Sequence, residues 1–166
     1  MKKIITILCI VFLSYSYTTT TVQDPFLGTW EWQQGNQVFR VELYVNEQNN
    51  IRGHYKMLNI DAQGQETIVY KSNKDLGHGF MYGPVIYGGS NGTDLFGAVV
   101  VDNITPNPNN FPILEGSLTM KIISTANCIG CQTTATWKIK EKKEWRNEGD
   151  NRTISIPIDI TLVKVQ

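Results

Sequence analysis

The chain has 166 residues, with 15 Lys and Arg against 15 Asp and Glu, so its formal net charge is zero. A neutral chain lacks the basic footprint of a nucleic-acid-binding protein, and an apolar fraction of 41% is too high for a disordered tail. We therefore expect one folded domain that builds its core without help from a metal or a disulfide, and we expect no nucleic-acid partner.

The first residues differ in character from the rest. Met1–Lys3 is basic, Ile4–Leu13 is an apolar run of ten residues interrupted only by Thr6, and a Ser, Tyr and Thr tract follows. This order is typical of a secretory signal peptide, and the run is too short to span a bilayer, which needs about 20 residues. We expect residues 1–20 to be a signal peptide and residues 21–166 a single domain, periplasmic or secreted, with no transmembrane segment.

The mature chain alternates apolar and polar residues with a period of two, between turns rich in Gly, Asn and Pro. No stretch of ten or more residues has helical periodicity. The pattern predicts nine strands, over Phe26–Trp32, Gln37–Val45, Asn50–Ile60, Gln65–Lys71, Pro84–Gly88, Thr93–Val101, Ile113–Ser124, Thr133–Glu141 and Ile154–Val165.

The connections indicate antiparallel neighbours. Asp61–Gly64 fits a hairpin loop with its glycine in the left-handed conformation, and Asn91-Gly92 is a strong hairpin signal. Ser72–Tyr82 and Asp102–Pro112 are longer surface loops, and Lys142–Arg152 is an exposed loop or one helical turn. Without crossover helices a parallel α/β sheet is excluded. We predict an all-β fold, an antiparallel up-and-down barrel of about nine strands, with a β-sandwich as the alternative.

The stretch Phe26-Leu27-Gly28-Thr29-Trp30, which opens the mature domain, resembles the G-x-W signature in the first strand of lipocalins and related calycin barrels. The resemblance implies a lipocalin-like barrel in which Trp30 is a structural plug across the closed end and Gly28 permits close backbone approach. The last strand carries Lys164 where the family has an Arg stacked on the Trp.

The whole chain also resembles small exported proteins of unknown function from Gram-negative bacteria. That likeness implies an exported β domain from such a bacterium and implies nothing about chemistry. It is carried by Gly28–Trp32, Gly53–Met57, Ile68–Asn73 and Ala135–Lys140.

Cys128-Ile129-Gly130-Cys131 is the most distinctive local motif. A C-x-x-C pair can be a redox centre, half of a zinc site or a disulfide. A thioredoxin-type site needs a helix after the motif and a zinc site needs further ligands, whereas β patterns lie on both sides here. In an oxidising compartment we predict a Cys128–Cys131 disulfide that fixes a hairpin tip, with redox or zinc chemistry as the alternatives. We expect no metal site.

The two histidines are the general-base candidates. His54 shares a strand face with Arg52 and Lys56, which indicates a solvated position, and His78 lies in the loop tripeptide Gly77-His78-Gly79. The chain has no G-x-S-x-G motif and no glycine-rich loop that precedes a helix. We therefore expect a protein that is not an enzyme and has no cofactor.

The strand aromatics give the positive hint about function. If Phe39, Tyr55, Tyr70 and Trp137 face inward, they line an apolar cavity with polar tips; alternatively, they fill the core. Our first expectation is a non-catalytic domain that binds a small apolar or amphipathic ligand in a barrel cavity of roughly 300 Å³ or more. The alternative is a loop-mediated protein- or glycan-binding module or inhibitor, with a filled core and an exposed patch around Ser72–Tyr82 or Asp102–Pro112.

Overall fold

The computed structural model describes residues 23–107, 109, 111–123 and 131–165, apart from the side chain of Trp145. The predicted signal peptide, residues 1–20, and Cys128 of the predicted disulfide lie outside the described residues. Both therefore stay predictions.

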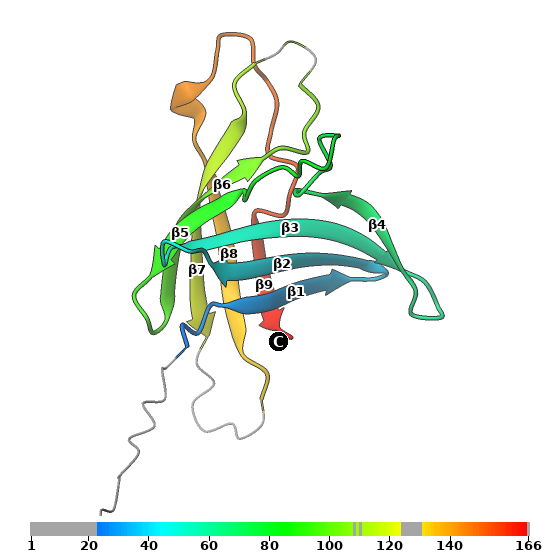
Figure 1. Cartoon of the computed structure of the whole chain (residues 1–166), viewed down its shortest axis with the longest axis vertical. Coiled ribbons are helices and arrows are strands. Elements are labelled where there is room, and N and C mark those ends of the chain that lie inside the picture. The colour runs from blue at the N-terminus through cyan, green and yellow to red at the C-terminus, as the bar shows by residue number, and fades with distance from the viewer. Residues whose placement is uncertain (1–22, 108, 110, 124–130, 166) are drawn as a thin grey trace, which may run out of the picture.

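All nine expected strands are present in the described part of the chain, and the only other regular element there is the 3-10 turn η1 (Lys143–Trp145) (Figure 1). Gly64 and Gly92 have positive φ angles of 81° and 76°, as the two hairpin predictions require. The strands are β1 (Gly28–Gln34), β2 (Gln37–Val45), β3 (Ile51–Ile60), β4 (Glu66–Lys71), β5 (Ile86–Ser90), β6 (Leu95–Asp102), β7 (Leu114–Ile123), β8 (Thr134–Glu141) and β9 (Asp159–Lys164).

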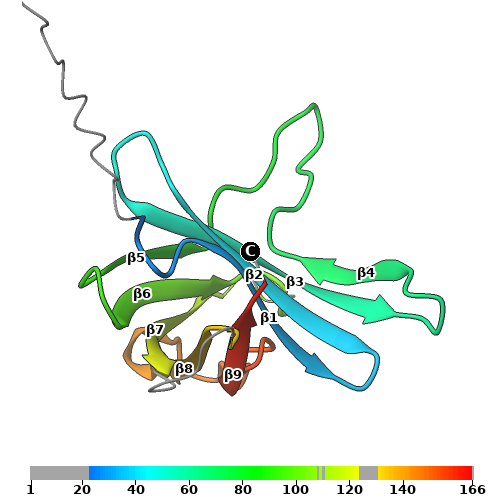
Figure 2. The same cartoon turned by 90° about the horizontal axis from the view of Figure 1, so that it is seen from below.

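Eight of these strands close into an antiparallel barrel, seen end-on in Figure 2. The ring runs β1-β2-β3-β5-β6-β7-β8-β9 and closes where β9 pairs with β1, with Trp30 opposite Lys164 and Glu31 opposite Val163. Closure gives every ring strand two neighbours, so the ring has no open edge. The predicted all-β barrel is confirmed, and the β-sandwich alternative is wrong.

The ninth strand, β4, lies outside the ring because β3 branches. Residues 51–53 of β3 pair with β5, whereas residues 56–60 pair with β4, and the β3–β4 register shifts between Met57 and Leu58. Figure 2 shows β4 beside the ring, next to the projecting end of the β1–β2 hairpin. The strand order therefore departs from a sequential one at β4.

The last strand is shorter than predicted, since β9 begins at Asp159 and not at Ile154. Pro157 lies inside the predicted range, and proline has no N–H to donate to a strand ladder. Ile154 and Ile156, which precede β9, are nevertheless buried, whereas Ile158, two residues further on, is 49% exposed.

One continuous apolar cluster fills the barrel. Along β7 the burial alternates residue by residue, which is the period expected of a strand with one face inward. The cluster consists of Phe26, Trp30, Phe39, Val41, Leu43, Ile51, Tyr55, Met57, Val85, Ile86, Phe96, Val100, Leu114, Leu118, Met120, Ala135, Trp137, Ile139, Ile154, Ile156 and Leu162.

Trp30 lies where the first and last strands meet. It is fully buried, and its Nε1 donates a 2.8 Å hydrogen bond to the carbonyl oxygen of Phe26. The Nζ of Lys164 lies 5.6 Å from the Trp30 ring centroid and donates a 2.7 Å hydrogen bond to the carbonyl oxygen of Pro25. Gly28 has φ of 113°, a conformation that favours glycine. These contacts join the start of the domain to its last strand.

A substitution at Gly88 tests how closely β5 approaches β6. A Cβ at this position would meet the carbonyl oxygen of Gly97 and lie 2.5 Å from the Cβ of Ala98. We expect Gly88→Ala to lower the free energy of unfolding by about 1–3 kcal/mol, measured by urea denaturation, because the two strands must move apart. The matched control is Gly89→Ala, where a Cβ meets nothing within 4 Å and the expected change is about 0.5 kcal/mol or less. Equal losses in the two variants would contradict this strand register.

Candidate functional site

Three of the four aromatic residues expected to line a cavity lie in the packed core. Phe39, Tyr55 and Trp137 are at most 1% exposed, and the Phe39 ring centroid lies 5.9 Å from that of Tyr55 and 5.7 Å from that of Trp137. Their polar atoms bond within the protein: the Tyr55 hydroxyl donates to the carbonyl oxygen of Val101 and Trp137 Nε1 to that of Pro157. The structure packs the Phe39 ring against the other two, and a ligand-lining role for the three residues stays a prediction.

Tyr70, the fourth aromatic residue, reaches the same cluster from β4. Its ring meets that of Tyr55 edge-on, with centroids 6.4 Å apart. Its hydroxyl is buried without a hydrogen-bond partner. Burial and, secondarily, the carboxylate of Asp102 raise the pKa of Tyr70 to about 12, so the hydroxyl is neutral at physiological pH. Tyr70 is thus a packing residue at the branch point of the sheet.

The loop between β4 and β5 is fixed to the barrel at its base. Ser72 is fully buried, and its Oγ and its main-chain N–H bond to the backbone of Tyr55 at 3.0 and 2.9 Å. Asn103, just after β6, donates its Nδ2 to the carbonyl oxygen of Ser72 at 2.7 Å and accepts from the Nζ of Lys74 at its own carbonyl oxygen. The loop therefore leaves the barrel in a defined direction.

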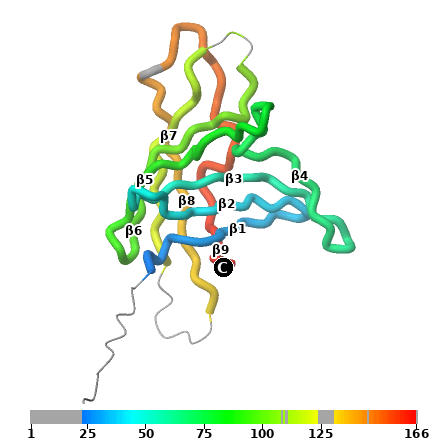
Figure 3. Tube along the Cα trace, in the orientation of Figure 1, coloured from blue at the N-terminus to red at the C-terminus, as the bar shows by residue number. Residues whose placement is uncertain are grey.

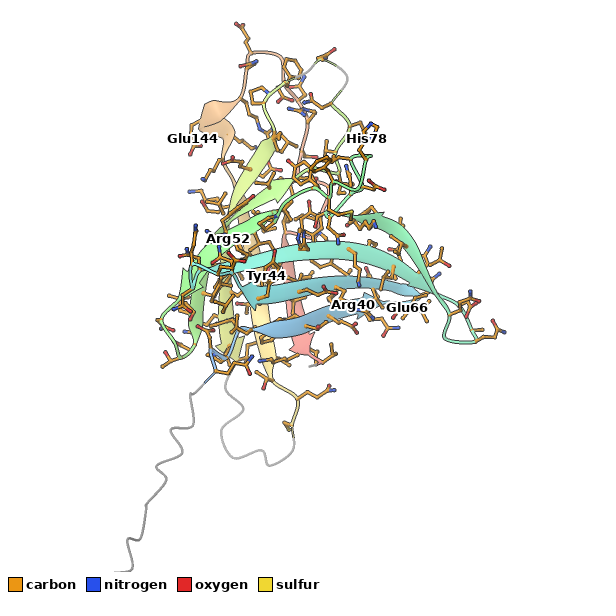
Figure 4. All side chains as sticks on the ribbon, viewed as in Figure 1. Arg40, Tyr44, Arg52, Glu66, His78 and Glu144 are labelled. Atoms are coloured by element: carbon orange, nitrogen blue, oxygen red, sulfur yellow. The ribbon has the colours of Figure 1, made fainter. Side chains whose placement is uncertain are left out.

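The tip of this loop is a small hairpin. Asp75 and Met81 form a β-bridge, and the N–H of Leu76 donates a 2.8 Å hydrogen bond to the carbonyl oxygen of Phe80. Residues 77–79 turn the chain with consecutive φ angles of 88°, 54° and 81°. Two of these positions are glycines, which adopt such angles without strain. Figure 4 shows His78 at this tip, away from the barrel core.

The hairpin carries apolar side chains into solvent. Phe80 is 70% exposed, Leu76 61% and Met81 50%, and the first two are the most exposed large apolar side chains in the described part of the chain. Ile68 and Val69 on neighbouring β4 are also exposed. This patch lies within or next to Ser72–Tyr82, one of the two loops where the sequence predicts an exposed surface.

His54 is half-buried, whereas its pattern predicted a solvated position. Its ring stacks on that of Tyr44 at 6.1 Å, and its Nδ1 lies 3.3 Å from the Oγ of Ser72. Burial lowers the pKa of His54, and the nearby Glu42 carboxylate only partly offsets this. The neutral imidazole is therefore favoured at physiological pH.

The Ser72–His54 pair is a contact that the sequence did not predict, and its geometry is structural. Ser72 has no exposed surface, and its Oγ already accepts the N–H of Tyr55. The adjoining hollow, which His54 and Glu42 line, has a volume of about 30 Å³. That volume suits a water molecule and not a substrate. This pair therefore gives no support to a hydrolytic site.

Asp102 organises the second long loop. Its Oδ1 accepts the N–H groups of Ile104 and Thr105, and its Oδ2 accepts the Thr105 hydroxyl together with the N–H and hydroxyl of Ser155. Burial raises the pKa of Asp102, but these hydrogen bonds outweigh burial and hold the pKa below its ordinary value. The carboxylate joins the end of β6 to the segment before β9.

Comparisons with protein-family models, with curated proteins and with solved structures find no match to this chain. In the residues that the structure describes, no helix has the length and apolar character needed to cross a bilayer.

The variant Asp102→Asn tests the role of the Asp102 carboxylate in joining the end of β6 to the segment before β9. The amide places an N–H₂ group among N–H and O–H donors, so we expect the free energy of unfolding at pH 7 to fall by about 2–4 kcal/mol. Because the folded pKa is lowered, the carboxylate stabilises the fold above pH of about 4, and this contribution is lost as the pH falls through the folded pKa.

Urea denaturation between pH 7 and pH 2 should therefore show the stabilities of wild type and Asp102→Asn converging in acid. Asp159→Asn is the control, because that exposed carboxylate lies 3.6 Å from the Lys138 ammonium and such a surface pair contributes about 1 kcal/mol or less. A difference between wild type and Asp102→Asn that stays constant with pH would refute this role for the charge.

Proposed function

We propose that this protein is a non-catalytic, exported, lipocalin-like domain that binds a partner protein through the tip of its β4–β5 loop. The observation that carries the proposal is the exposure of Leu76, Phe80 and Met81 on a hydrogen-bonded hairpin. Aromatic residues and Met are enriched at protein interfaces, and soluble proteins rarely expose apolar side chains in clusters without a binding role.

The lipocalin-like part of the proposal is supported at the closed end of the barrel. In that family an Arg stacks on the Trp of the G-x-W signature. Here the ammonium of Lys164 lies 5.6 Å from the centroid of the Trp30 ring, so a cation takes the corresponding place. Exported location follows from the predicted signal peptide.

The packed core favours a loop-mediated function over an interior ligand. Phe39 packs against both Tyr55 and Trp137 in the buried apolar core of the barrel. An interior ligand would have to displace these rings, whose burial stabilises the fold. The loop tip is exposed without any such rearrangement.

The chemistry of the tip favours a protein over a glycan. Leu, Phe and Met side chains offer no hydrogen-bond donors to pair with sugar hydroxyls, whereas they fill apolar grooves on proteins. The loop base is held by Ser72 and Asn103, and the hairpin has its own backbone hydrogen bonds. A pre-ordered loop loses little conformational entropy on binding, which favours affinity.

Site-specific photocrosslinking in producing cells tests the proposal. A photoreactive amino acid at position 80 should give a discrete protein adduct, and the same probe at Leu95, an exposed residue at the start of β6, should not. The adduct at position 80 should disappear when Leu76→Ser is added, because the loop tip then loses a second apolar side chain that we expect to contact the partner protein.

With the crosslinked partner purified, Phe80→Ser should weaken binding by about tenfold or more, and Leu95→Ser should leave the Kd within about twofold. Circular dichroism spectra of both variants should match wild type. Equal adducts at positions 80 and 95, or flotation of the protein on phospholipid vesicles without any protein adduct, would overturn the proposal.

A further inference from the structure

A second feature, separate from the loop tip, lies above the barrel where two long segments rise side by side (Figure 3). A hollow of about 480 Å³ opens there between the start of β7 and the turn η1. We propose that this hollow binds a small amphipathic carboxylate, a molecule with a short alkyl chain and one carboxylate group. The hollow is lined by Pro112, Ile113, Leu114, Glu115, Lys142 and Arg146.

The size and walls of the hollow suit such a ligand. Sites for small molecules are concave, have volumes of roughly 300–1,000 Å³, and combine apolar walls with a few polar groups. Pro112, Ile113 and Leu114 supply the apolar side, and Lys142 and Arg146 supply the polar side. The apolar side would take the alkyl chain and the polar side the headgroup.

The walls are held in place by hydrogen bonds across the two segments. The Nη2 of Arg152 donates a 2.6 Å hydrogen bond to the carbonyl oxygen of Pro112, and its guanidinium lies 5.5 Å from the Phe111 ring centroid. The N–H of Lys142 donates a 2.9 Å hydrogen bond to the carbonyl oxygen of Glu115. The hollow is therefore formed before any ligand enters.

Arg146 contributes an unused donor. Its Nη2 pairs with Glu141 at 3.1 Å, and its Nη1 donates to the carbonyl oxygen of Arg152. Its Nε is buried and has no hydrogen-bond partner. Leaving a buried N–H unpaired costs about 1–3 kcal/mol, and because Arg146 lines the hollow, a ligand acceptor that reached Nε would remove this cost.

Lys142 supplies a second cationic donor. The 3-10 turn η1 separates it from Arg146, and both side chains line the same hollow. The Nζ of Lys142 lies 3.6 Å from Glu115 Oε2, which is longer than a hydrogen bond. Two cationic donors favour a headgroup that only accepts and carries opposite charge, as a carboxylate does. Glu115 and Glu141 lie beside these two cations and oppose negative charge in the ligand, so a headgroup with one negative charge is favoured over a phosphate monoester with two.

Titration calorimetry with octanoate tests the inference, and octanol and octyl phosphate are the comparison compounds. Octanoate should bind at one site, at least about tenfold more tightly than either comparison compound. Arg146→Gln should weaken octanoate binding by a similar factor, and Lys138→Gln, at an exposed lysine on β8, should leave it unchanged.

Arg146 also holds Glu141, so a second pair of variants tests the site without touching that contact. Ile113 is 52% exposed at the hollow, and Ile113→Lys and Ile113→Glu remove the same apolar surface while adding opposite charges. Ile113→Lys should keep octanoate binding within about threefold, and Ile113→Glu should weaken it by about tenfold or more.

Octanol binding as tightly as octanoate, equal effects of the two Ile113 variants, or no octanoate binding would overturn the inference. Octanoate binding should be unchanged in Phe80→Ser, which separates this inference from the proposed loop function.

Discussion

The barrel depends on a narrow seam between its first and last strands. In the part of the chain that the structure describes, two ladder pairs, Trp30 with Lys164 and Glu31 with Val163, join β1 to β9, and the N–H of Val165 adds a 2.9 Å hydrogen bond to the carbonyl oxygen of Thr29. Side chains reinforce this short ladder: Trp30 is buried across it, and the Lys164 ammonium lies over the indole ring and bonds to the carbonyl oxygen of Pro25. The Trp30 ring is buried and Lys164 is partly buried, and a cation–π contact of this kind contributes about 1 kcal/mol. Without the seam, β1 and β9 would both become open edges.

The branching of β3 converts this closed ring into a scaffold with a projecting loop. Gly53 lies at the branch, where a Cβ would come within 2.7 Å of the carbonyl oxygen of Glu42 and of the Leu43 side chain. Because Gly53 has no Cβ, β2, β3 and β5 can approach closely at this point. The second half of β3 then diverges and pairs with β4. Arg40 reaches Glu66 across this divergent end, as Figure 4 shows. The β4–β5 loop therefore starts at the rim of the barrel and not within it.

The sequence predicts where the strands are, because the alternation of apolar and polar residues is a local property. It predicts poorly which strands pair, because pairing depends on residues that are distant in the chain. β4 holds the consecutive apolar residues Ile68, Val69 and Tyr70 and its burial does not alternate as that of β7 does, but a run of apolar residues does not identify the strand that lies outside the ring. Pro157 indicates in the sequence that the last strand begins after residue 157, because proline has no N–H to donate to a strand ladder. The sequence shows Leu76 and Phe80 as apolar residues in a glycine-containing loop. Their exposure to solvent depends on the hairpin that the tip of the β4–β5 loop forms. The charged residues Lys142 and Arg146 do not by themselves predict a hollow, because its other wall comes from the distant segment 112–115.

The end of β6 links the two surfaces to which we assign binding. Asp102 bonds to Ser155 and so positions the segment that runs from the hollow to β9. The next residue, Asn103, bonds to Ser72 and accepts from Lys74, and so positions the base of the β4–β5 loop. A buried carboxylate is costly unless donors surround it, as they do here. The five hydrogen bonds that Asp102 accepts offset this cost, and together with Asn103 they hold the two loops against the barrel. The rigid ring thus sets the distance between the loop tip and the hollow, while Asp102 and Asn103 set their directions.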